Sequence, residues 1–398
     1  MRRPLNGIRV LDFCWIGAGS YTTKILADMG ADVIKVESEM HLDSLRKGPP
    51  FKDGKPGVNR SGYFADRNSS KRSLTLNMKH PEAREVALDL VRSCDLVTNN
   101  FTPGVMERFG LGYDSVRAVK PDIIFVSMSM QGQTGPESAY LGYGLTIGAV
   151  TGLQYLSGLP DREPSGTGTN YPDHIPNPCH TAFAIIAALR HRRRTGEGQV
   201  IDVAQTEPTV AILGSEMCAA WSGGPEQARQ GNRAQGMAPH GVFPVQGEDR
   251  WIAIAAPDNA AWAGIERVLG SFGPGLDTLA GRLAAVDRLE AMIAERTLGW
   301  EGQALMSALQ AEAVAAGIVQ TAADIVDTDP QLRHRNHWQV MAQPGVGDML
   351  YNAPPWRFSV TPSGLRGPAP LLGEHTQAIV EEELGRVGAG AAAPDLFR

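Results

Sequence analysis

The segment Ile8-Arg-Val-Leu-Asp-Phe13 is followed by Gly17-Ala-Gly19-Ser20, a stretch of helix length that ends at Met29, and then Asp32-Val-Ile-Lys-Val36. The first and last segments are short apolar runs typical of buried strands, and Gly30 between them is a helix stop signal. Together they predict a β-α-β unit, in which a crossover helix joins two parallel strands. This unit decides the fold class.

The same alternation continues along the chain. Further strands are predicted at 73–77, 95–98, 122–127 and 199–203, with helices at 81–93 and from Pro178 to Arg194. Strands and helices that alternate in this way predict an α/β fold with a Rossmann-like, doubly wound parallel sheet.

The 398 residues predict more than one domain. We expect a large Rossmann-like domain over 1–221, a linker and a smaller α+β domain over 222–326, and a C-terminal segment over 327–398. The linker is expected because 222–241 has few aliphatic residues, and the C-terminal segment is expected to contain a strand at 356–360.

Composition excludes several classes of function. The net charge of −6 gives no general attraction to nucleic acid or to an anionic membrane. The four cysteines form no Cys-x-x-Cys pair, so no metal site is expected. No apolar run reaches the length of about 18 residues that a membrane helix needs. We expect a soluble cytoplasmic protein.

Asp173 lies in Gly166-Thr-Gly-Thr-Asn-Tyr-Pro-Asp173-His-Ile-Pro-Asn177-Pro178, just before a long predicted helix for which Asn177 is the candidate N-cap. A carboxylate on such a turn, close to a positive helix end, is suited to remain ionised and exposed as a nucleophile. An ordinary turn or capping role is the commoner explanation for an Asp in this setting. The segment alone favours the ordinary turn or capping role.

The first strand-to-helix turn also suggests a dinucleotide site, because Gly17-x-Gly19 precedes a helix and Glu37 ends the second strand. Thr22 occupies the third glycine position of that motif, which argues against NAD.

Two further groups of residues have simple structural explanations. A thiol–imidazole pair at Cys179 is less expected than a buried structural cysteine. The basic run from Arg190 to Arg194 is more typical of a solvated helix end than of a phosphate site.

Eight short motifs follow one another in order: Leu5-x-Gly-Ile-Arg-Val-Leu-Asp12, Leu26-Ala-Asp-Met-Gly-Ala-Asp-Val-Ile-Lys-Val-Glu37, Asn68-x-x-Lys-Arg-Ser73 with Leu76-Asn-Met-Lys79, Asn100-Phe-Thr-Pro-Gly-Val-Met-Glu-Arg-Phe-Gly-Leu-Gly112, Gly132-Gln-Thr-Gly-Pro136, Thr195-Gly-x-Gly-Gln199, Pro239-His-Gly241 and Pro370-Leu-Leu-Gly-Glu-His375. Through them nearly the whole chain resembles the class III coenzyme A transferases, the family of formyl-CoA and carnitine CoA transferases.

The resemblance implies that Asp173 attacks an acyl-CoA thioester to form a mixed anhydride, and that CoA then forms an aspartyl thioester which the acceptor acid resolves. Backbone N–H groups near Gly236 and Gly241 are candidate oxyanion donors. The implied CoA contacts are Gly17, Ala18, Leu76, Asn100, Phe101, Val105 and Arg108, with Lys71 and Arg72 as further candidates at the nucleotide end.

The candidate residues for recognising the acid are Tyr143, His174, Asn177, Gly236 and His240. A group able to bind a second carboxylate favours a succinyl-CoA donor and a dicarboxylic or aryl-substituted acceptor. The resemblance further implies an interlocked homodimer and a C-terminal segment that returns to the large domain.

The chain departs from two branches of the family. Formyl-CoA transferases have a glutamine at the place of Gly17 and a tetraglycine loop near 231–236, so formate or oxalate is disfavoured. The α-methylacyl-CoA racemases have a Gly-His-Asp motif where this chain has Gly142-Tyr143-Gly144, which removes one proton-transfer partner. A racemase-like enzyme and a non-catalytic acyl-CoA-binding protein are the alternatives.

Overall fold

The computed structural model describes residues 2–224, 228–388 and 393–398. The chain divides into two compact units. The first contains the described residues of Met1–Gln154, Gly166–Glu226 and Gln331–Arg398, and the second contains those of Tyr155–Ser165 and Gln227–Pro330. Each unit is described by itself below.

The first unit is built on a parallel sheet. Within the described ranges the sheet has six strands in the order β3-β2-β1-β4-β5-β6. Their bounds are β1 Arg9–Phe13, β2 Asp32–Glu37, β3 Arg72–Thr75, β4 Leu96–Asn99, β5 Ile124–Ser127 and β6 Gln199–Asp202. This order confirms the predicted α/β sheet. From β1 the chain adds strands toward one edge as far as β3 and then toward the other edge from β4, so the strand order switches between β1 and β4.

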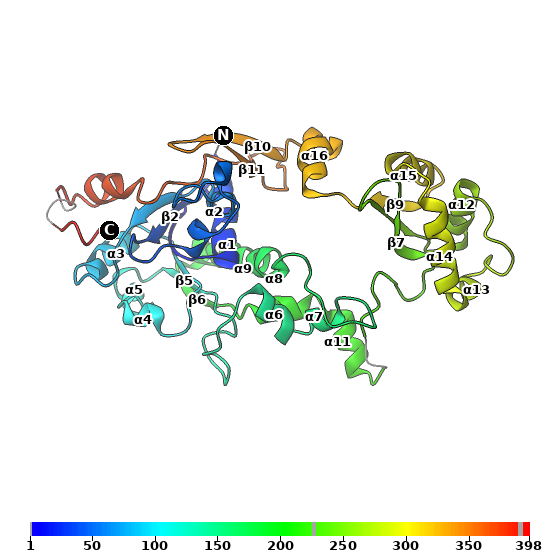
Figure 1. Ribbon diagram of the computed structural model, residues 1–398. Helices are drawn as coiled ribbons and strands as arrows, with labels where there is room; N and C mark the ends of the chain where they lie inside the picture. Colours follow the sequence, from blue (N-terminus) through cyan, green and yellow to red (C-terminus); the bar gives the residue numbers. More distant parts are fainter. Residues whose placement is uncertain (1, 225–227, 389–392) are drawn as a thin grey trace. The chain divides into compact units, whose positions relative to one another are not determined.

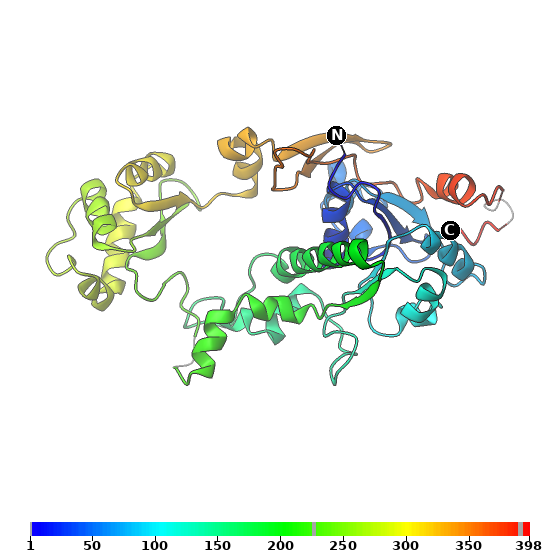
Figure 2. The same ribbon diagram turned by 180° about the vertical axis from the view of Figure 1, so that it is seen from behind.

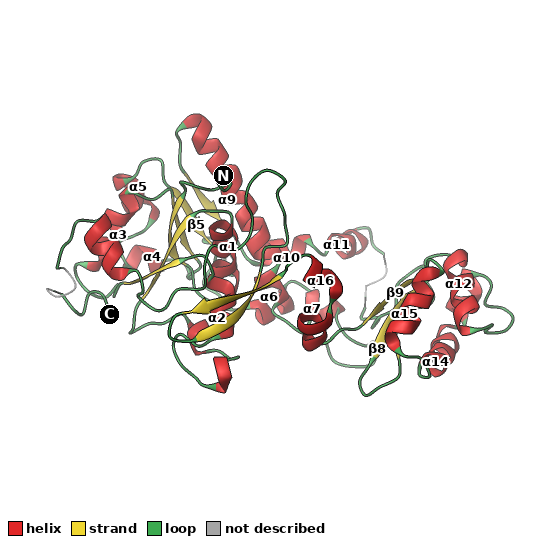
Figure 3. Ribbon diagram, turned by 90° about the horizontal axis from the view of Figure 1, so that it is seen from above, coloured by secondary structure: helices red, strands yellow, loops and turns green. Residues whose placement is uncertain are grey.

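Helices cover both faces of this sheet (Figures 1 and 3). On one face α1 (Gly17–Asp28) packs beside α9 (Pro176–Thr195), which Figure 2 shows from behind. On the other face lie α3 (Ala83–Arg92) and α5 (Tyr113–Val119). Strands β1 to β5 are therefore mostly buried on both sides, as their apolar residues predict, whereas the edge strand β6 is largely exposed.

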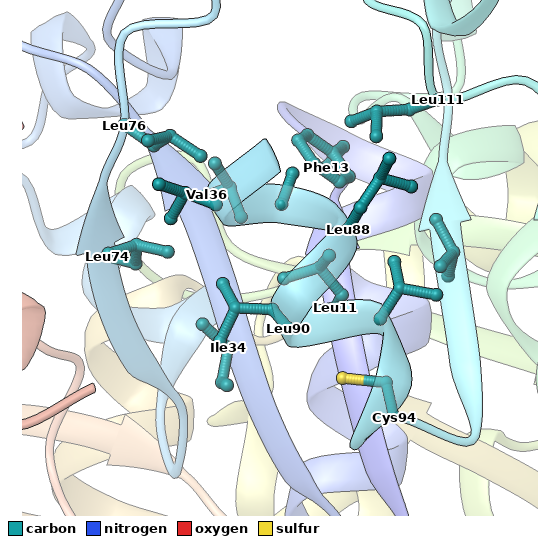
Figure 4. Packing of buried hydrophobic residues seen from close by; sticks show 14 of the residues in the cluster. Leu11, Phe13, Ile34, Val36, Leu74, Leu76, Leu88, Leu90, Cys94 and Leu111 are labelled. Atoms are coloured by element: carbon teal, nitrogen blue, oxygen red, sulfur yellow. The ribbon is translucent and has the colours of Figure 1, made fainter. Parts of the chain in front are cut away.

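The larger core of this unit joins the sheet to α3 (Figure 4). Leu11, Ile34 and Leu74 from three adjacent strands pack against Leu88 and Leu90 of the helix. The buried residues of α3 include Ala83, Val86, Ala87, Leu90 and Val91, whose helical spacing gives the helix one apolar face. The burial of Leu11 fixes the register of β1, whose carboxyl end leads into the candidate site.

Outside these elements and the core of the second unit, the described chain contains η1 Ser44–Lys47, η2 Lys52–Gly54, α2 Gly62–Asn68, α4 Val105–Arg108, α6 Gly144–Val150, α7 Leu153–Leu156, α8 Tyr171–His174, α10 Thr206–Ala211, α11 Gly214–Trp221, η3 Asp324–Thr328, α16 Pro330–His334, β10 Trp338–Gln343, β11 Gly347–Asn352 and η4 Ala378–Glu383, of which η3 belongs to the second unit. Strands β10 and β11 form an antiparallel hairpin. The predicted strand at 356–360 is wrong, because those residues form loop and bends while the hairpin just before them makes the strand pairs.

The second unit has an antiparallel sheet, which in the described part of the chain runs β7-β8-β9. Its strands are β7 His240–Pro244, β8 Trp251–Ala255 and β9 Ala315–Ile318. They pack with α12 (Asn259–Leu269), α13 (Leu279–Ala284), α14 (Val286–Thr297) and α15 (Gly302–Ala311) around a separate core centred on Trp262.

No helix among the residues that the structure describes is long and apolar enough to cross a membrane.

Candidate active site

The Asp173 side chain belongs to the short helix α8 and is 5% exposed. It is therefore buried at a cavity wall, which corrects the expectation of an exposed carboxylate on a turn. Burial raises the pKa of Asp173 to about 6, although the Gly144 N–H, which donates to Oδ2 at 3.0 Å, favours the ionised form. A desolvated carboxylate that still ionises near neutral pH is a suitable nucleophile.

Two glycines leave room for this carboxylate. A Cβ at Gly17 would lie 2.8 Å from the Asp173 Cβ, and a Cβ at Gly144 would lie 2.8 Å from its Oδ2. Both distances are shorter than any ordinary contact, so an alanine at either position requires Asp173 to move. The close approach of Gly17 and Gly144 holds the carboxylate from two sides.

The Gly17-x-Gly19 motif thus serves the packing of this chain's own side chains. A Cβ at Gly19 would lie 2.7 Å from the Cβ of Cys14 and 3.0 Å from the amide carbon of Asn100. The glycines are required because Asp173, Cys14 and Asn100 approach the start of α1 closely.

The turn between β1 and α1 is held by side chains from other elements. Asn100 accepts from the Trp15 N–H at 2.9 Å and donates to the Trp15 carbonyl at 2.7 Å. Asp43 accepts from the N–H of Ile16, which has φ 61° and ψ −146°. Such a conformation is costly for a β-branched residue and persists only where its surroundings impose it.

These groups meet at the carboxyl ends of β1 and β4, where the strand order reverses and α/β sheets usually bind ligands. A cavity of about 580 Å³ opens there. Its walls include seven of the predicted site residues, namely Gly17, Ala18, Asn100, Phe101, Val105, Tyr143 and Asp173. The structure thus brings the predicted nucleophile together with most of the predicted CoA contacts.

A second cavity of about 300 Å³ adjoins the first, because Trp15, Phe101 and Val105 line both. Leu76, another predicted CoA contact, lines this second cavity. Trp15 and Phe101 meet edge to face, with ring centroids 5.4 Å apart. The lining of the second cavity is mainly apolar, with Lys79 and His41 among its polar members.

The other predicted residues lie outside these linings. Arg108 is exposed at the end of α4. His174 contacts Tyr63 and Arg67, and Asn177 donates to Gln205, whose side chain lines the larger cavity.

Gly236 and His240 belong to the second unit. There the His240 Nδ1 is paired with the Asn232 carbonyl.

Several expectations about individual residues are wrong. Lys71 is buried and bonds Asp12, Thr23 and Asn68, so it is not held for a nucleotide. Arg72 is half-buried and pairs with Asp32 and Glu383. Cys179 is exposed. Asn177 is not an N-cap, because α9 begins one residue earlier at Pro176.

Sequence reasoning missed the Gly144 N–H, Gln205, Trp15 and Ile16. The motif Gly142-Tyr143-Gly144 contains Gly144 but does not indicate this contact. A backbone N–H that meets a side chain 29 positions away gives no local signal, since tertiary packing creates the contact.

The chain matches CoA-transferase family III over residues 5–376. It is 32% identical over 386 residues to the succinate–glutarate CoA-transferase of Agrobacterium fabrum, with 95% of each chain covered. It is 34% identical to the succinyl-CoA:mesaconate CoA-transferase of Haloarcula marismortui, covering 95% of this chain and 96% of that protein.

A solved structure agrees with this relationship. The crystal structure of a CAIB/BAIF family protein from Brucella suis superposes with a TM-score of 0.87 at 33% identity, covering 96% of this chain and 100% of the other. The family match spans most of the chain and the identities exceed 30% over nearly full length. The chain therefore belongs to CoA-transferase family III and is a CoA-transferase.

Proposed function

We propose that this CoA-transferase moves CoA from succinyl-CoA to a dicarboxylic acid, with Asp173 as the covalent nucleophile. The observation that carries the role of Asp173 is its buried carboxylate, held between Gly17 and Gly144 at the wall of a cavity at the switch point of the sheet. The choice of substrates is supported by the relatives, whose names include succinate–glutarate and succinyl-CoA:mesaconate CoA-transferase.

In the first half of the reaction, an oxygen of Asp173 attacks the thioester carbonyl carbon, and the C–S bond breaks to release CoA as its thiolate. The product is a mixed anhydride between Asp173 and the donor acyl group. The thiolate then attacks Cγ of Asp173, which expels the donor acid as a carboxylate and leaves an aspartyl-CoA thioester.

In the second half, the acceptor carboxylate attacks that thioester and again releases the thiolate. Attack of the thiolate on the acceptor's carbonyl carbon yields the new acyl-CoA and returns Asp173 as a carboxylate. No net proton transfer is needed, so the reaction requires no general base for the nucleophile.

Cγ of Asp173 becomes tetrahedral when the thiolate or the acceptor carboxylate attacks it. Negative charge then develops on the carbonyl oxygen of Asp173. The Gly144 N–H already donates to Oδ2 and is suited to stabilise that charge.

The two adjoining cavities are suited to the two ends of an acyl-CoA. The larger holds the thioester beside Asp173, and the apolar smaller one, reached past Trp15 and Phe101, accepts part of the CoA arm. Lys79 and the exposed Arg108 are cations available to CoA phosphates.

We further propose a homodimer, interlocked as in the family, in a reducing cytoplasm. Large apolar side chains are exposed along the first unit, with Phe183 at 76%, Leu141 at 76% and Trp221 at 91%. Exposure of this kind marks an association surface. The four cysteines are free thiols, which fits a reducing compartment.

The test combines turnover with detection of the intermediate. Incubation with succinyl-CoA and a panel of mono- and dicarboxylic acids is expected to form a new acyl-CoA with dicarboxylates. Mass spectrometry after borohydride or hydroxylamine treatment is expected to find the modification at Asp173. The mechanism is refuted if the Asp173→Ala variant is active and the wild type shows no modified peptide. Proton–deuterium exchange at the α-carbon without CoA transfer supports a racemase instead.

A further inference from the structure

The three residues between β1 and α1 are held by side chains. Five backbone groups of this turn make such bonds: the Cys14 N–H with Asp12 at 2.9 Å, the Cys14 carbonyl with Lys35 at 2.7 Å, the Trp15 N–H and carbonyl with Asn100 at 2.9 and 2.7 Å, and the Ile16 N–H with Asp43 at 3.1 Å. The chemical steps on Asp173 involve neither Lys35 nor Asp43.

Ile16 has an unusual backbone conformation in this turn. Its φ of 61° and ψ of −146° belong to a region that glycine occupies readily and that a β-branched residue avoids. Its side chain lines the larger cavity and packs against the buried cluster that contains Leu45 and Phe64. The protein thus keeps a bulky wall residue at a position whose backbone favours glycine, and the surroundings of Ile16 must impose that conformation.

The ion pair of Lys35 and Asp43 holds the turn on both sides of Trp15. The Lys35 Nζ lies 2.9 Å from the Asp43 Oδ2, and it also donates to the Cys14 carbonyl. The Asp43 Oδ1 accepts from the Ile16 N–H. Both charged side chains are completely buried. The pair therefore fixes the carbonyl before Trp15 and the N–H after it, relative to each other.

Both partners of this pair remain charged. Burial raises the pKa of Asp43, but the Lys35 ammonium and the N–H groups of Leu45 and Ile16 hold that pKa below its usual value. Burial lowers the pKa of Lys35, but the carboxylates of Asp43 and Glu37 hold it above its usual value. A buried ion pair adds little to stability, because the desolvation of both charges offsets their attraction. A role in conformation explains its presence better.

The turn reaches Asp173 through Gly17, the residue that follows Ile16. A Cβ at Gly17 would lie 2.8 Å from the Asp173 Cβ. Ile16, Gly17 and Asp173 also line the same cavity. If Ile16 returned to a negative φ, the peptide after it would turn, and Gly17 would no longer fit against the Asp173 side chain. The conformation of Ile16 is therefore linked by direct contact to the position of the reacting carboxylate.

We propose that Lys35 and Asp43 are positioning residues, which hold Ile16 in its glycine-like conformation and so keep Gly17 and the cavity wall fixed against Asp173. This inference rests on the proposed function of Asp173. Every step of the proposed reaction forms or breaks a bond at Asp173 or at an acyl group beside it. A wall that holds this carboxylate in one place keeps the reacting atoms in line throughout.

The kinetic test compares two buried carboxylates, with each variant checked for folding by circular dichroism. Asp43→Ala is expected to lower kcat by about 100-fold, with a smaller effect on KM for the acyl-CoA, because Asp173 leaves its near-attack position. Asp43→Asn still offers an oxygen to the Ile16 N–H and should recover part of that loss.

Asp28→Ala is the matched control. Asp28 is a buried carboxylate at the other end of α1, with its Oδ2 2.5 Å from the Lys24 Nζ. Its loss also leaves a buried lysine without its partner, so stability should fall while kcat is retained. An equal loss of kcat in Asp28→Ala and Asp43→Ala overturns the proposal, because general destabilisation would then explain both.

A double-mutant cycle isolates the conformation of Ile16. Glycine adopts a positive φ without help, so Asp43→Ala should cost no more than about 10-fold in kcat when it is combined with Ile16→Gly. Lys35→Met, which replaces the ammonium by an apolar end, gives the same comparison if Asp43→Ala does not fold. A loss that is equal with and without Ile16→Gly overturns the proposal.

Crystallography tests the same point without turnover. The wild type is expected to show a positive φ at Ile16, and folded Asp43→Ala is expected to show a negative φ with Gly17 displaced from Asp173. A negative φ in the wild type overturns the proposal, and so does a positive φ that persists in Asp43→Ala.

The two levels of inference fail differently. If Asp173→Asn remains active, the proposed nucleophile is wrong. If Asp173 is required and modified but Asp43→Ala retains full turnover, only the positioning role of Lys35 and Asp43 is wrong.

Discussion

Gly17 and Asp173 lie so close that a single added methyl group at Gly17 would be 2.8 Å from the Asp173 Cβ and 3.1 Å from its Cγ. The two residues are far apart in the sequence, one at the start of α1 and the other in α8. Their contact explains why the first strand-to-helix turn requires a glycine, and it yields the first prediction.

Gly17→Ala is expected to lower kcat/KM by about 100-fold, because the new Cβ displaces the carboxylate by a fraction of an ångström or more. Gly166→Ala is the matched control, since a Cβ there meets nothing within 4 Å and activity should be retained. Steady-state kinetics on both proteins measures the difference. Equal activity of the two variants would show that the position of Asp173 is not limiting.

The pH dependence of kcat/KM should have an acid limb near the raised pKa of Asp173, which is about 6. Only the ionised carboxylate attacks, so activity falls as pH decreases through that value. The profile is measured with an acyl-CoA whose own groups do not titrate in this range. A limb near the ordinary aspartate pKa of about 4 would contradict the burial argument.

Asp173→Asn should abolish transfer and stabilise the fold at pH 8 by about 1–3 kcal/mol. The folded-state pKa of Asp173 is raised, so the wild type loses stability as pH rises from about 4 through about 6, whereas the neutral amide does not. Urea unfolding at pH 8 and at pH 4 measures the effect. The advantage of the variant should disappear at the lower pH, and an advantage that is equal at both values would rule out this cause.

Phe183→Asp should weaken the proposed homodimer, because a carboxylate on an apolar association surface remains unpaired and desolvated. Light scattering during size-exclusion chromatography measures the mass. Phe183→Tyr preserves most of the apolar ring and is expected to remain dimeric. A wild type that is monomeric at micromolar concentration contradicts the proposed assembly directly.

Much of the fold was predictable from local patterns. The runs at β1, β2 and β4 are rich in Val, Leu and Ile at consecutive positions, and such runs favour strands buried on both faces of a parallel sheet. The predicted strand at 356–360 failed because strand propensity does not specify a pairing partner, and the hairpin of β10 and β11 has one.

The candidate site was also predictable only in part. The resemblance singled out Asp173 and the cluster from Asn100 to Val105, and the structure places them around one cavity. The engagement of Lys71 with Asp12 could not be foreseen, because an isolated lysine in a motif carries no information on whether its charge faces solvent or a buried carboxylate.

By itself, the sequence determined the class of sheet, the family and the residue expected to act as nucleophile, because these depend on periodic burial and on short ordered motifs. Only the tertiary structure decided that the Asp173 carboxylate is buried between Gly17 and Gly144 and that His174 is held between Arg67 and Tyr63. The physical reason is that desolvation, pKa and hydrogen-bond direction depend on neighbours from distant segments, which only the folded chain brings together.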